Sequence, residues 1–136
     1  MWEHFSHPAD VGIRGFGATR VEAFAEAAVA MTAIVCSPGE IRPVEAVKIS
    51  CQNEDSELLF VDWLNTLLCE MAVRKMVFSR FDVEIDGGRL EAQVWGEVFD
   101  TARHQAGTEV KAATYHQLKV YQDNAGRWVA QCVVDV

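Results

Sequence analysis

The sequence lacks long hydrophobic runs, a secretion signal and an excess of basic residues. No apolar stretch approaches the roughly 20 residues that a membrane-spanning helix needs, and the first four residues have neither the basic start nor the apolar segment of a secretion signal. Twelve basic and 20 acidic residues leave a formal net charge of −8. Nucleic-acid affinity comes largely from Lys and Arg that neutralise phosphates. We therefore expect a cytoplasmic protein with no membrane segment and no strong nucleic-acid binding of its own.

Cysteine chemistry is also poorly represented. The four cysteines form no C-x-x-C pair and have no zinc-type spacing. Each lies in an apolar or amphipathic segment, which predicts buried, reduced thiols in a reducing cytosol. These residues are Cys36, Cys51, Cys69 and Cys132.

Sequence motifs for hydrolysis and nucleotide binding are missing as well. The chain has no G-x-S-x-G elbow and no Walker-type loop, and no cysteine stands in a polar setting beside a histidine. Gly12, Gly15 and Gly17 are not spaced as in the dinucleotide fingerprint. Bulges or a close approach of two backbones explain these glycines better.

The length, apolar content and hydrophobic periodicity of the chain predict one α+β domain over residues 1–136. Half of the residues are apolar, and a chain of this length buries enough surface for a proper core. Hydrophobic periodicity predicts two strands, a helix, a strand, a helix and four strands, and hence a two-layer, sandwich-like, mostly antiparallel sheet with two helices. The expected strands are Trp2–Phe5, Val11–Phe16, Ile41–Cys51, Phe81–Ile85, Leu90–Val98, Glu109–Tyr121 and Trp128–Val136.

Two helices are marked by their ends and their apolar stripes. Thr19 and Glu22 form a capping box, and the helix that follows runs to about Val35. The second helix spans about Glu57–Val73 and is preceded by capping residues. The expected apolar stripes are Val21, Phe24, Ala25, Ala28, Met31, Thr32 and Val35 in the first helix, and Leu58, Val61, Leu64, Leu67, Leu68 and Met71 in the second, with Phe60 and Trp63 beside it.

The last strand carries the most informative pattern. It is apolar on both faces, as in a strand inside a sheet, and it runs to the final residue. The α-carboxylate of Val136 then lies next to Asp135, and two adjacent negative groups need a cation, a basic side chain or water as partner. Asp10 stands directly before the second strand. If these strand ends are neighbours, three carboxylates converge on an all-oxygen site for Ca²⁺ or Mg²⁺, although 20 acids generate such triples by chance.

The roles of two further sets of polar residues remain open at this point. His4, His7 and Asp10 have a spacing that could hold a transition metal, but a structural role for the two histidines explains them better. In the long strand, Lys111 and Tyr115 lie on the more polar face. Either residue could touch a partner or a phosphate, and a lysine on a strand is usually just solvated.

Several segments resemble the archease family, in order and over essentially the whole chain. They are Trp2–Arg14, Val21–Ala28, Trp95–Glu97, Thr108–His116 and the Asp135–Val136 ending. The Thr-Glu-Val-Lys block and the acid one residue before the end are the specific matches. Archease sequences usually have Thr where this chain has Pro8, and often Ile where it has Val136. The first difference stiffens the loop, and the second leaves the carboxylate unchanged.

The resemblance implies a function and a set of site residues. Archease-like proteins activate the RtcB-type tRNA-splicing RNA ligase, help it load guanylate and sustain multiple turnovers. By resemblance, Asp10, Asp135 and the Val136 carboxylate would bind a divalent metal ion, Ca²⁺ foremost and Mg²⁺ or Mn²⁺ as alternatives, and Lys111 would act at the same surface. Two other hypotheses stay open: a stand-alone metal-dependent hydrolase, and a general chaperone-like binding module.

Overall fold

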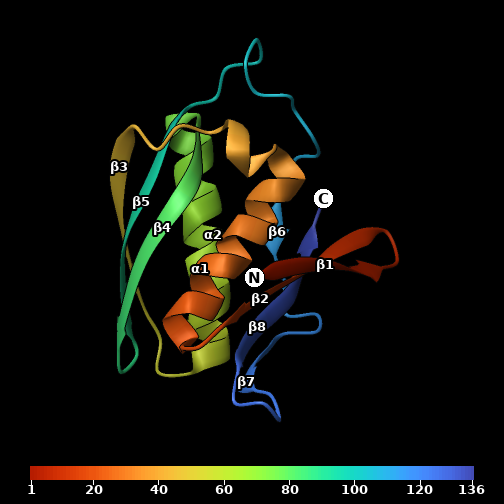
Figure 1. The fold of residues 1–136 in the computed structure, drawn as a ribbon, viewed down its shortest axis with the longest axis vertical. Coiled ribbons are helices and arrows are strands. Elements are labelled where there is room, and N and C mark those ends of the chain that lie inside the picture. The colour runs from red at the N-terminus through yellow and green to blue at the C-terminus, as the bar shows by residue number, and fades with distance from the viewer.

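Two antiparallel sheets enclose a pair of helices in the computed structural model, which describes residues 1–136 (Figure 1). One sheet lies on the left of the view, the other on the right, and the helices fill the space between them. The elements are β1 (Trp2–His7), β2 (Asp10–Gly17), α1 (Arg20–Val35), a 3₁₀ turn (Pro38–Glu40), β3 (Glu45–Gln52), α2 (Ser56–Arg74), β4 (Met76–Asp86), β5 (Arg89–Val98), β6 (Ala112–Ala113), β7 (Lys119–Gln122) and β8 (Trp128–Asp135).

The strands divide by their pairing into sheet A and sheet B. Sheet A has the order β1-β2-β8-β6, with β7 also paired to β8, and sheet B has the order β3-β5-β4. Strand β8 lies inside sheet A, and its residues 129–134 are all buried, as the apolar pattern on both faces predicted. The α+β class, the two helices and the antiparallel pairing are confirmed. Neither helix has the length and hydrophobicity that crossing a lipid bilayer requires.

Both helices begin at the predicted capping residues. The hydroxyl of Thr19 accepts a hydrogen bond from the Glu22 amide, and the Glu22 carboxylate accepts one from the amide of Ala18. Asp55 caps α2 by accepting from the amides of Glu57 and Leu58. These caps satisfy amides that have no partner within the helix, so local sequence sets both starting points.

The helices are buried more widely than a single apolar stripe predicts. Because sheet B also approaches α1, Ala23, Ala27 and Ala30 are fully buried in addition to the expected residues. Within the layer, the indole N–H of Trp63 donates to the carbonyl of Phe24. Leu58, expected in the stripe of α2, is 38% exposed instead. Helices between two sheets bury two sides, so their buried surface is broader than an amphipathic stripe.

A close approach of backbones explains Gly15. A Cβ at this position would lie 2.3 Å from the carbonyl oxygen of Ala23 and 2.3 Å from the nitrogen of Ala27. Helix α1 therefore rests directly on β2. At Gly12 a Cβ would meet the ring of Phe5 at 2.2 Å. The sequence interpretation of a close backbone approach is confirmed for Gly15, whereas the neighbour of Gly12 is a side chain.

The predicted long strand Glu109–Tyr121 is wrong. Only β6 and β7 are strands in this range, and the chain turns away between them. The Thr114 hydroxyl donates to the carbonyl of Val133 and accepts from the amide of His116, and Gln117 has a left-handed φ of 55°. Local side-chain hydrogen bonds of this kind compete with a continuous strand. Strand β3 also begins at Glu45 rather than Ile41, after the 3₁₀ turn.

The prediction of four buried thiols is confirmed for two cysteines only and is wrong for Cys69. All four cysteines are free, and Cys36 and Cys132 are buried, whereas Cys51 is half-buried and Cys69 is exposed on α2. Burial raises the pKa of the Cys132 thiol to about 12 and that of Cys51 to about 11. These two thiols stay protonated at neutral pH and are poor nucleophiles.

Hydrogen bonds to Glu97 hold the segment that follows β5. The carboxylate accepts from the guanidinium of Arg103, from the amide of Arg42 and from Nε2 of His104. His104 is fully buried, and its Nδ1 accepts from the amide of Asp100. The Arg103 hydrogen bond contributes most to lowering the pKa of Glu97, from 4.5 to about 2. Glu97 therefore ties β5 to both flanking loops.

We expect this network to make stability depend on acid pH. A carboxyl group whose pKa is depressed on folding stabilises the fold above the pKa of the unfolded chain, and this contribution is lost as the pH falls. For Glu97 the loss spans about pH 4.5 to 2. Glu97→Gln should lower the Tm at pH 7 and flatten its decline over that range, measured by thermal denaturation. Glu45→Gln, at an exposed position of β3, is the matched control, and identical acid profiles for all three proteins would contradict the assignment.

Candidate carboxylate site at the end of sheet A

The structure brings the start of β2 beside the end of β8. Their antiparallel register runs from Gly17 opposite Trp128 to Val11 opposite Val134. One further step along this ladder places Asp10 opposite Asp135. Asp10 therefore begins β2 at the end of sheet A where Asp135 ends β8, and Val136 follows directly.

Lys111 reaches the same place from the other side of β8. Its backbone N–H donates to the carbonyl of Asp135 at 2.8 Å, and the next residue, Ala112, pairs with Asp135 in the β6–β8 ladder. The four residues singled out from the sequence thus come from three chain segments and meet at one sheet end. The position of Lys111 is fixed by its backbone, so its side chain takes no part in holding the strands together.

The side chains at this end have no ionic partners within the chain. Asp10, Asp135 and Lys111 are absent from all eight ion pairs of the structure. Asp135 and Lys111 are exposed, Asp10 is half-buried, and the Val136 side chain packs against the core. Like charges directly opposite each other on neighbouring strands destabilise a sheet. An unpaired carboxylate pair of this kind is suited to a bound cation or to a basic group of a partner.

The donor set fits a hard cation if the chain end contributes. No three side chains of His, Cys, Asp or Glu are gathered closely enough to hold a metal ion. The sequence analysis predicts two carboxylates, those of Asp10 and Asp135, and the terminal carboxylate of Val136 as a third oxygen donor. Ca²⁺ and Mg²⁺ bind carboxylate oxygens and fill their shells with water, so three carboxylates meet the requirement.

The turn before Asp10 is a tight hairpin connection. His7 pairs with Asp10 across it, so Pro8 and Ala9 alone reverse the chain. Pro8 restricts its own φ, and Ala9 takes a left-handed φ of 64°. This connection sets the position of Asp10 without contributing a side-chain ligand of its own.

Two histidine rings lie close together near the β1–β2 connection. His7 lies opposite Asp10, and its ring centroid is 6.0 Å from that of His116. In the sequence, the spacing of His4, His7 and Asp10 pointed to His7. The three residues do not form one site. His4 lies on the other face of β1, where its Nε2 donates to the carbonyl of Ala30 at 2.7 Å. His116 could not be linked to His7 without the fold.

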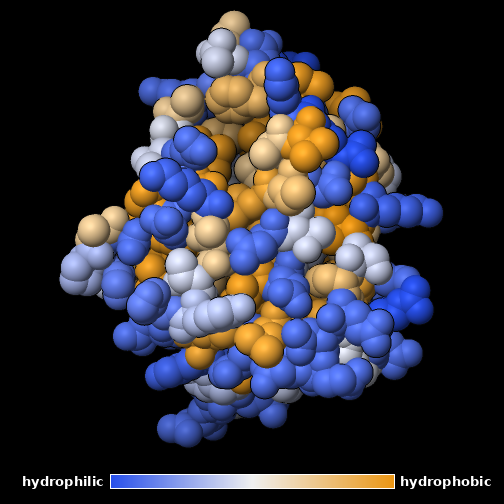
Figure 2. Space-filling view, turned by 180° about the vertical axis from the view of Figure 1, so that it is seen from behind, coloured by the Kyte–Doolittle hydropathy of each residue, from blue (hydrophilic) through white to orange (hydrophobic).

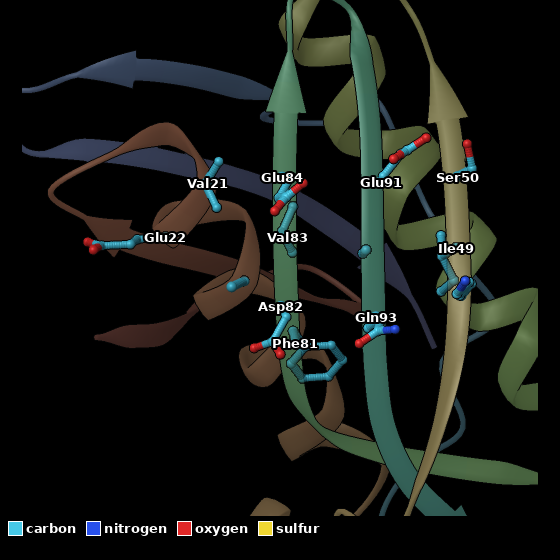
Figure 3. A pocket seen from close by; sticks show the side chains of 13 residues that line it. Val21, Glu22, Ile49, Ser50, Phe81, Asp82, Val83, Glu84, Glu91 and Gln93 are labelled. Atoms are coloured by element: carbon cyan, nitrogen blue, oxygen red, sulfur yellow. The ribbon is translucent and has the colours of Figure 1, made fainter.

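A hollow of about 810 Å³ lies away from the carboxylates, against sheet B and the start of α1 (Figure 3). Glu84 and Glu91 project from neighbouring strands and face each other in register. The lining includes Ser50 but no histidine and no cysteine. Ser50 lies opposite Glu91 in the β3–β5 ladder, but no hydrogen bond joins the hydroxyl to the carboxylate, so this hollow offers no activated nucleophile.

A second hollow is apolar and leads toward Lys111. Seen from behind, hydrophobic side chains line a recess in the upper part of the molecule (Figure 2). A hollow of about 570 Å³ lies between the ends of α1 and α2 and residues 106–110. The amides of Gly107 and Thr108 donate to the carbonyls of Val35 and Ile34, which attaches this wall to α1. The wall continues directly into Lys111.

Comparison with known proteins shows the family of this chain. Residues 2–136 match the model of the Archease protein family (MTH1598/TM1083). The chain belongs to the archease family. It is 37% identical to protein archease of Pyrococcus abyssi, with 99% of this chain and 98% of that protein covered. The archease of Pyrococcus furiosus is 38% identical, and the alignment covers 100% of this chain and 99% of the relative.

Solved structures of the family share the fold. The solution structure of Methanobacterium thermoautotrophicum protein 1598 superimposes with a TM-score of 0.83 at 28% identity, covering 99% of this chain and 98% of that one. A crystal structure from Thermotoga maritima, described as an archease and possible chaperone, gives a TM-score of 0.68 at 23% identity and covers 100% of this chain and 98% of that one. The archease resemblance of the sequence is thus confirmed, and so is the fold that it implied.

Proposed function

We propose that this archease is a non-catalytic, cytoplasmic accessory protein that activates an RNA ligase of the RtcB type. In this role it promotes guanylylation of the ligase and multiple turnover during tRNA splicing or RNA repair. Family membership supports an accessory role. The observation that carries the proposal is the meeting of Asp10, Asp135 and Lys111 at one sheet end without ionic partners.

The site acts by presenting a divalent cation to the ligase. Asp10, Asp135 and the Val136 carboxylate hold the ion, and Lys111 contacts the partner beside it. Oxygen donors alone favour Ca²⁺ or Mg²⁺, with Mn²⁺ as the third alternative. The bound ion docks against the nucleotide–metal site of the ligase, where fixed charge can stabilise the transferring phosphoryl group. An acidic chain suits the basic mouth of such an enzyme better than it suits RNA.

Two alternatives predict different behaviour. A stand-alone metal-dependent hydrolase would turn over a phosphoester by itself, and chelation would abolish this activity. Its support is weak, because neither the carboxylate site nor the hollow on sheet B has an activated nucleophile. A general chaperone-like module would bind many unfolded proteins, and the apolar hollow beside residues 106–110 is the feature that favours it. That activity would be indifferent to the carboxylates.

A multiple-turnover ligation assay tests the proposal directly. A purified RtcB-type ligase is supplied with RNA ends carrying 2′,3′-cyclic phosphate and 5′-hydroxyl groups, with and without this protein. We expect product to exceed the ligase concentration only when the protein is present, and guanylylated ligase to accumulate faster. Equal turnover numbers in both reactions would contradict the proposed function.

Extending the chain beyond Val136 provides a more specific prediction. A few added residues convert the terminal carboxylate into an amide carbonyl, so the site loses one negative donor. We expect cation affinity to fall at least tenfold in isothermal titration, and ligase stimulation to fall with it. The same residues added before Met1 are the control. An extended protein with unchanged cation affinity would remove the chain end from the ligand set.

A further inference from the structure

We propose that the outer edge of β1 pairs with β1 of a second copy of this chain, so that the two five-stranded sheets join into one continuous antiparallel sheet. The two-fold axis of this dimer passes beside His4. The association is independent of the proposed ligase role and of the carboxylate site. The observations behind it are a row of unpaired backbone groups, an edge without protecting features, and one register in which the charges of the two copies are complementary.

The outward backbone groups of β1 follow from its pairing with β2. Strand β1 is the first strand of sheet A, so it has a neighbouring strand on one side only. Opposite residues of an antiparallel pair alternate between those that exchange hydrogen bonds and those that do not. The amide of Phe16 donates to the carbonyl of Met1, so Met1 and every second residue after it bond to β2. The amides and carbonyls of Trp2, His4 and Ser6 therefore point away from the sheet.

This edge lacks the features that usually keep strands from associating. Natural edge strands are short or bulged, or they carry Lys or Pro. Strand β1 has six residues without Lys or Pro and pairs with β2 without a break in register. By contrast, β4 has a register shift between Phe78 and Arg80, β3 contains Lys48, and β6 and β7 have only two and four residues. The β1–β2 hairpin extends beyond the rest of the molecule at the right of Figure 1, so a second copy can reach it.

One two-fold register uses all three outward residues. With His4 opposite His4 of the second copy, Trp2 lies opposite Ser6 and Ser6 opposite Trp2, and each of these pairs exchanges two hydrogen bonds. A register centred on Glu3 keeps only two such pairs and places the two Glu3 carboxylates opposite each other, which destabilises a sheet. A register centred on Phe5 also keeps only two pairs. The register centred on His4 is therefore the favoured one.

The outer-face side chains are complementary in this register. It places Glu3 opposite Phe5 of the second copy. Within one chain, the guanidinium of Arg14 donates to the Glu3 carboxylate at 2.6 Å and lies over the Phe5 ring, 4.6 Å from its centroid. The Glu3 side chain remains 44% exposed. In the dimer, the guanidinium over each Phe5 lies beside Glu3 of the other copy, so each carboxylate gains a second cationic donor.

Helix α1 leaves room for the second copy. It packs directly on β2, where a Cβ at Gly15 would meet backbone atoms of Ala23 and Ala27, and this strand lies one position in from the edge. The imidazole of His4 is hydrogen-bonded to the carbonyl of Ala30 in the same helix. The His4 side chain is thus held by its own chain, and the backbone groups beside the axis are left for pairing.

The expected dimer is weak. Pairing of two strand edges buries less than the roughly 1,200 Å² of a stable interface, so we expect a dissociation constant on the order of 100 µM. Each copy carries a formal net charge of −8, and repulsion between the copies is screened by salt. Added NaCl should therefore strengthen the dimer, whereas it would weaken an association driven by attraction between net charges.

Amide hydrogen exchange of the full-length protein, followed by NMR from about 20 µM to about 1 mM, tests the proposed pairing. From mass action with this dissociation constant, the amides of Trp2, His4 and Ser6 should exchange about threefold more slowly at the higher concentration. The amides of Glu3 and Phe5, which already bond to β2, should exchange equally at both. Sedimentation over the same range should show the average mass rising above the 15.1 kDa of one chain.

Two substitutions at one position separate the backbone from the side chain. Ser6→Pro removes an outward N–H that no strand of its own chain uses, and proline is tolerated in edge strands. We expect this variant to remain monomeric at about 1 mM. Ser6→Ala keeps the N–H and is the matched control, so it should dimerise as the wild type does. Thermal denaturation verifies folding, and Ser6→Lys, which places a charge at the edge, gives the same test if the proline variant unfolds.

The outcomes distinguish this inference from the proposed function. A constant mass of 15.1 kDa over the whole range, or a dimer in which the outward amides of β1 gain no protection, would overturn the pairing. Protection that appears only after an RtcB-type ligase is added would assign this edge to the ligase and overturn the second copy as its occupant. Ligase stimulation is measured separately, so its absence would overturn the proposed function and leave the dimer standing.

Discussion

Asp135→Ala and Asp10→Ala are each expected to reduce ligase stimulation to the unassisted rate while the fold survives. Each substitution removes one of the three carboxylates that we propose as cation ligands, and the remaining pair is too weak a set for a hard ion that needs several oxygen ligands. Neither side chain takes part in an ion pair, and Asp135 is exposed. Relief of repulsion between like charges should leave the Tm unchanged or slightly higher. Multiple-turnover ligation and thermal denaturation measure the two effects.

Glu84→Ala is the matched control for these variants. Glu84 is an exposed carboxylate on sheet B that faces Glu91, so its loss changes the net charge by the same amount at a distant surface. Stimulation should remain at the wild-type level. If Glu84→Ala were as inactive as Asp135→Ala, net charge would explain the effect and the site would not.

Lys111→Ala should have the same functional effect for a different reason. The backbone amide of Lys111, and not its side chain, is bonded to Asp135, so the strands stay paired after truncation. We expect cation binding to persist and ligase stimulation to be lost, because in the proposed mechanism the ammonium group contacts the partner. Full stimulation by all three alanine variants, Asp10, Asp135 and Lys111, would rule out the mechanism.

Gly15→Ala is expected to cause the largest loss of stability, about 3 kcal/mol in the free energy of unfolding. Overpacking of a well-packed interior costs about 1–3 kcal/mol and occasionally more. The new methyl group would meet backbone atoms of Ala23 and Ala27 at 2.3 Å, and backbone cannot rotate away as a side chain can. Helix α1 would have to lift from β2. Urea denaturation measures the loss, and Gly15→Val should prevent folding.

Gly39→Ala tests whether this effect is specific to the contact. Nothing lies within 4 Å of a Cβ at Gly39, in the 3₁₀ turn after α1. Its substitution should change stability by no more than about 0.5 kcal/mol, as is usual for surface positions. Equal losses at the two glycines would mean that α1 does not rest on β2 as described.

These predictions differ in how far the sequence alone identified the residues on which they rest. Asp10, Asp135 and Lys111 were singled out from strand ends and from a family resemblance, before any fold was known. Their proximity depended on the register of β2 and β8, which pairs residues more than 100 positions apart. Gly15 was correctly interpreted as a close approach, but its partners in α1 became known only from the packing. No sequence pattern predicted that His116 lies near His7, because their proximity depends on the turn at Gln117.

The sequence by itself determined the helices, their caps, the buried last strand and the candidate ligands. Periodicity, capping hydrogen bonds and turn residues act over a few positions, so they can be seen along the chain. Only the tertiary structure decided that the strands form two sheets around the helices, that the predicted strand over 109–121 is broken, and that the rings of His7 and His116 lie near each other. Which strands pair depends on packing between segments that are distant in the sequence. A local sequence pattern therefore does not predict the pairing.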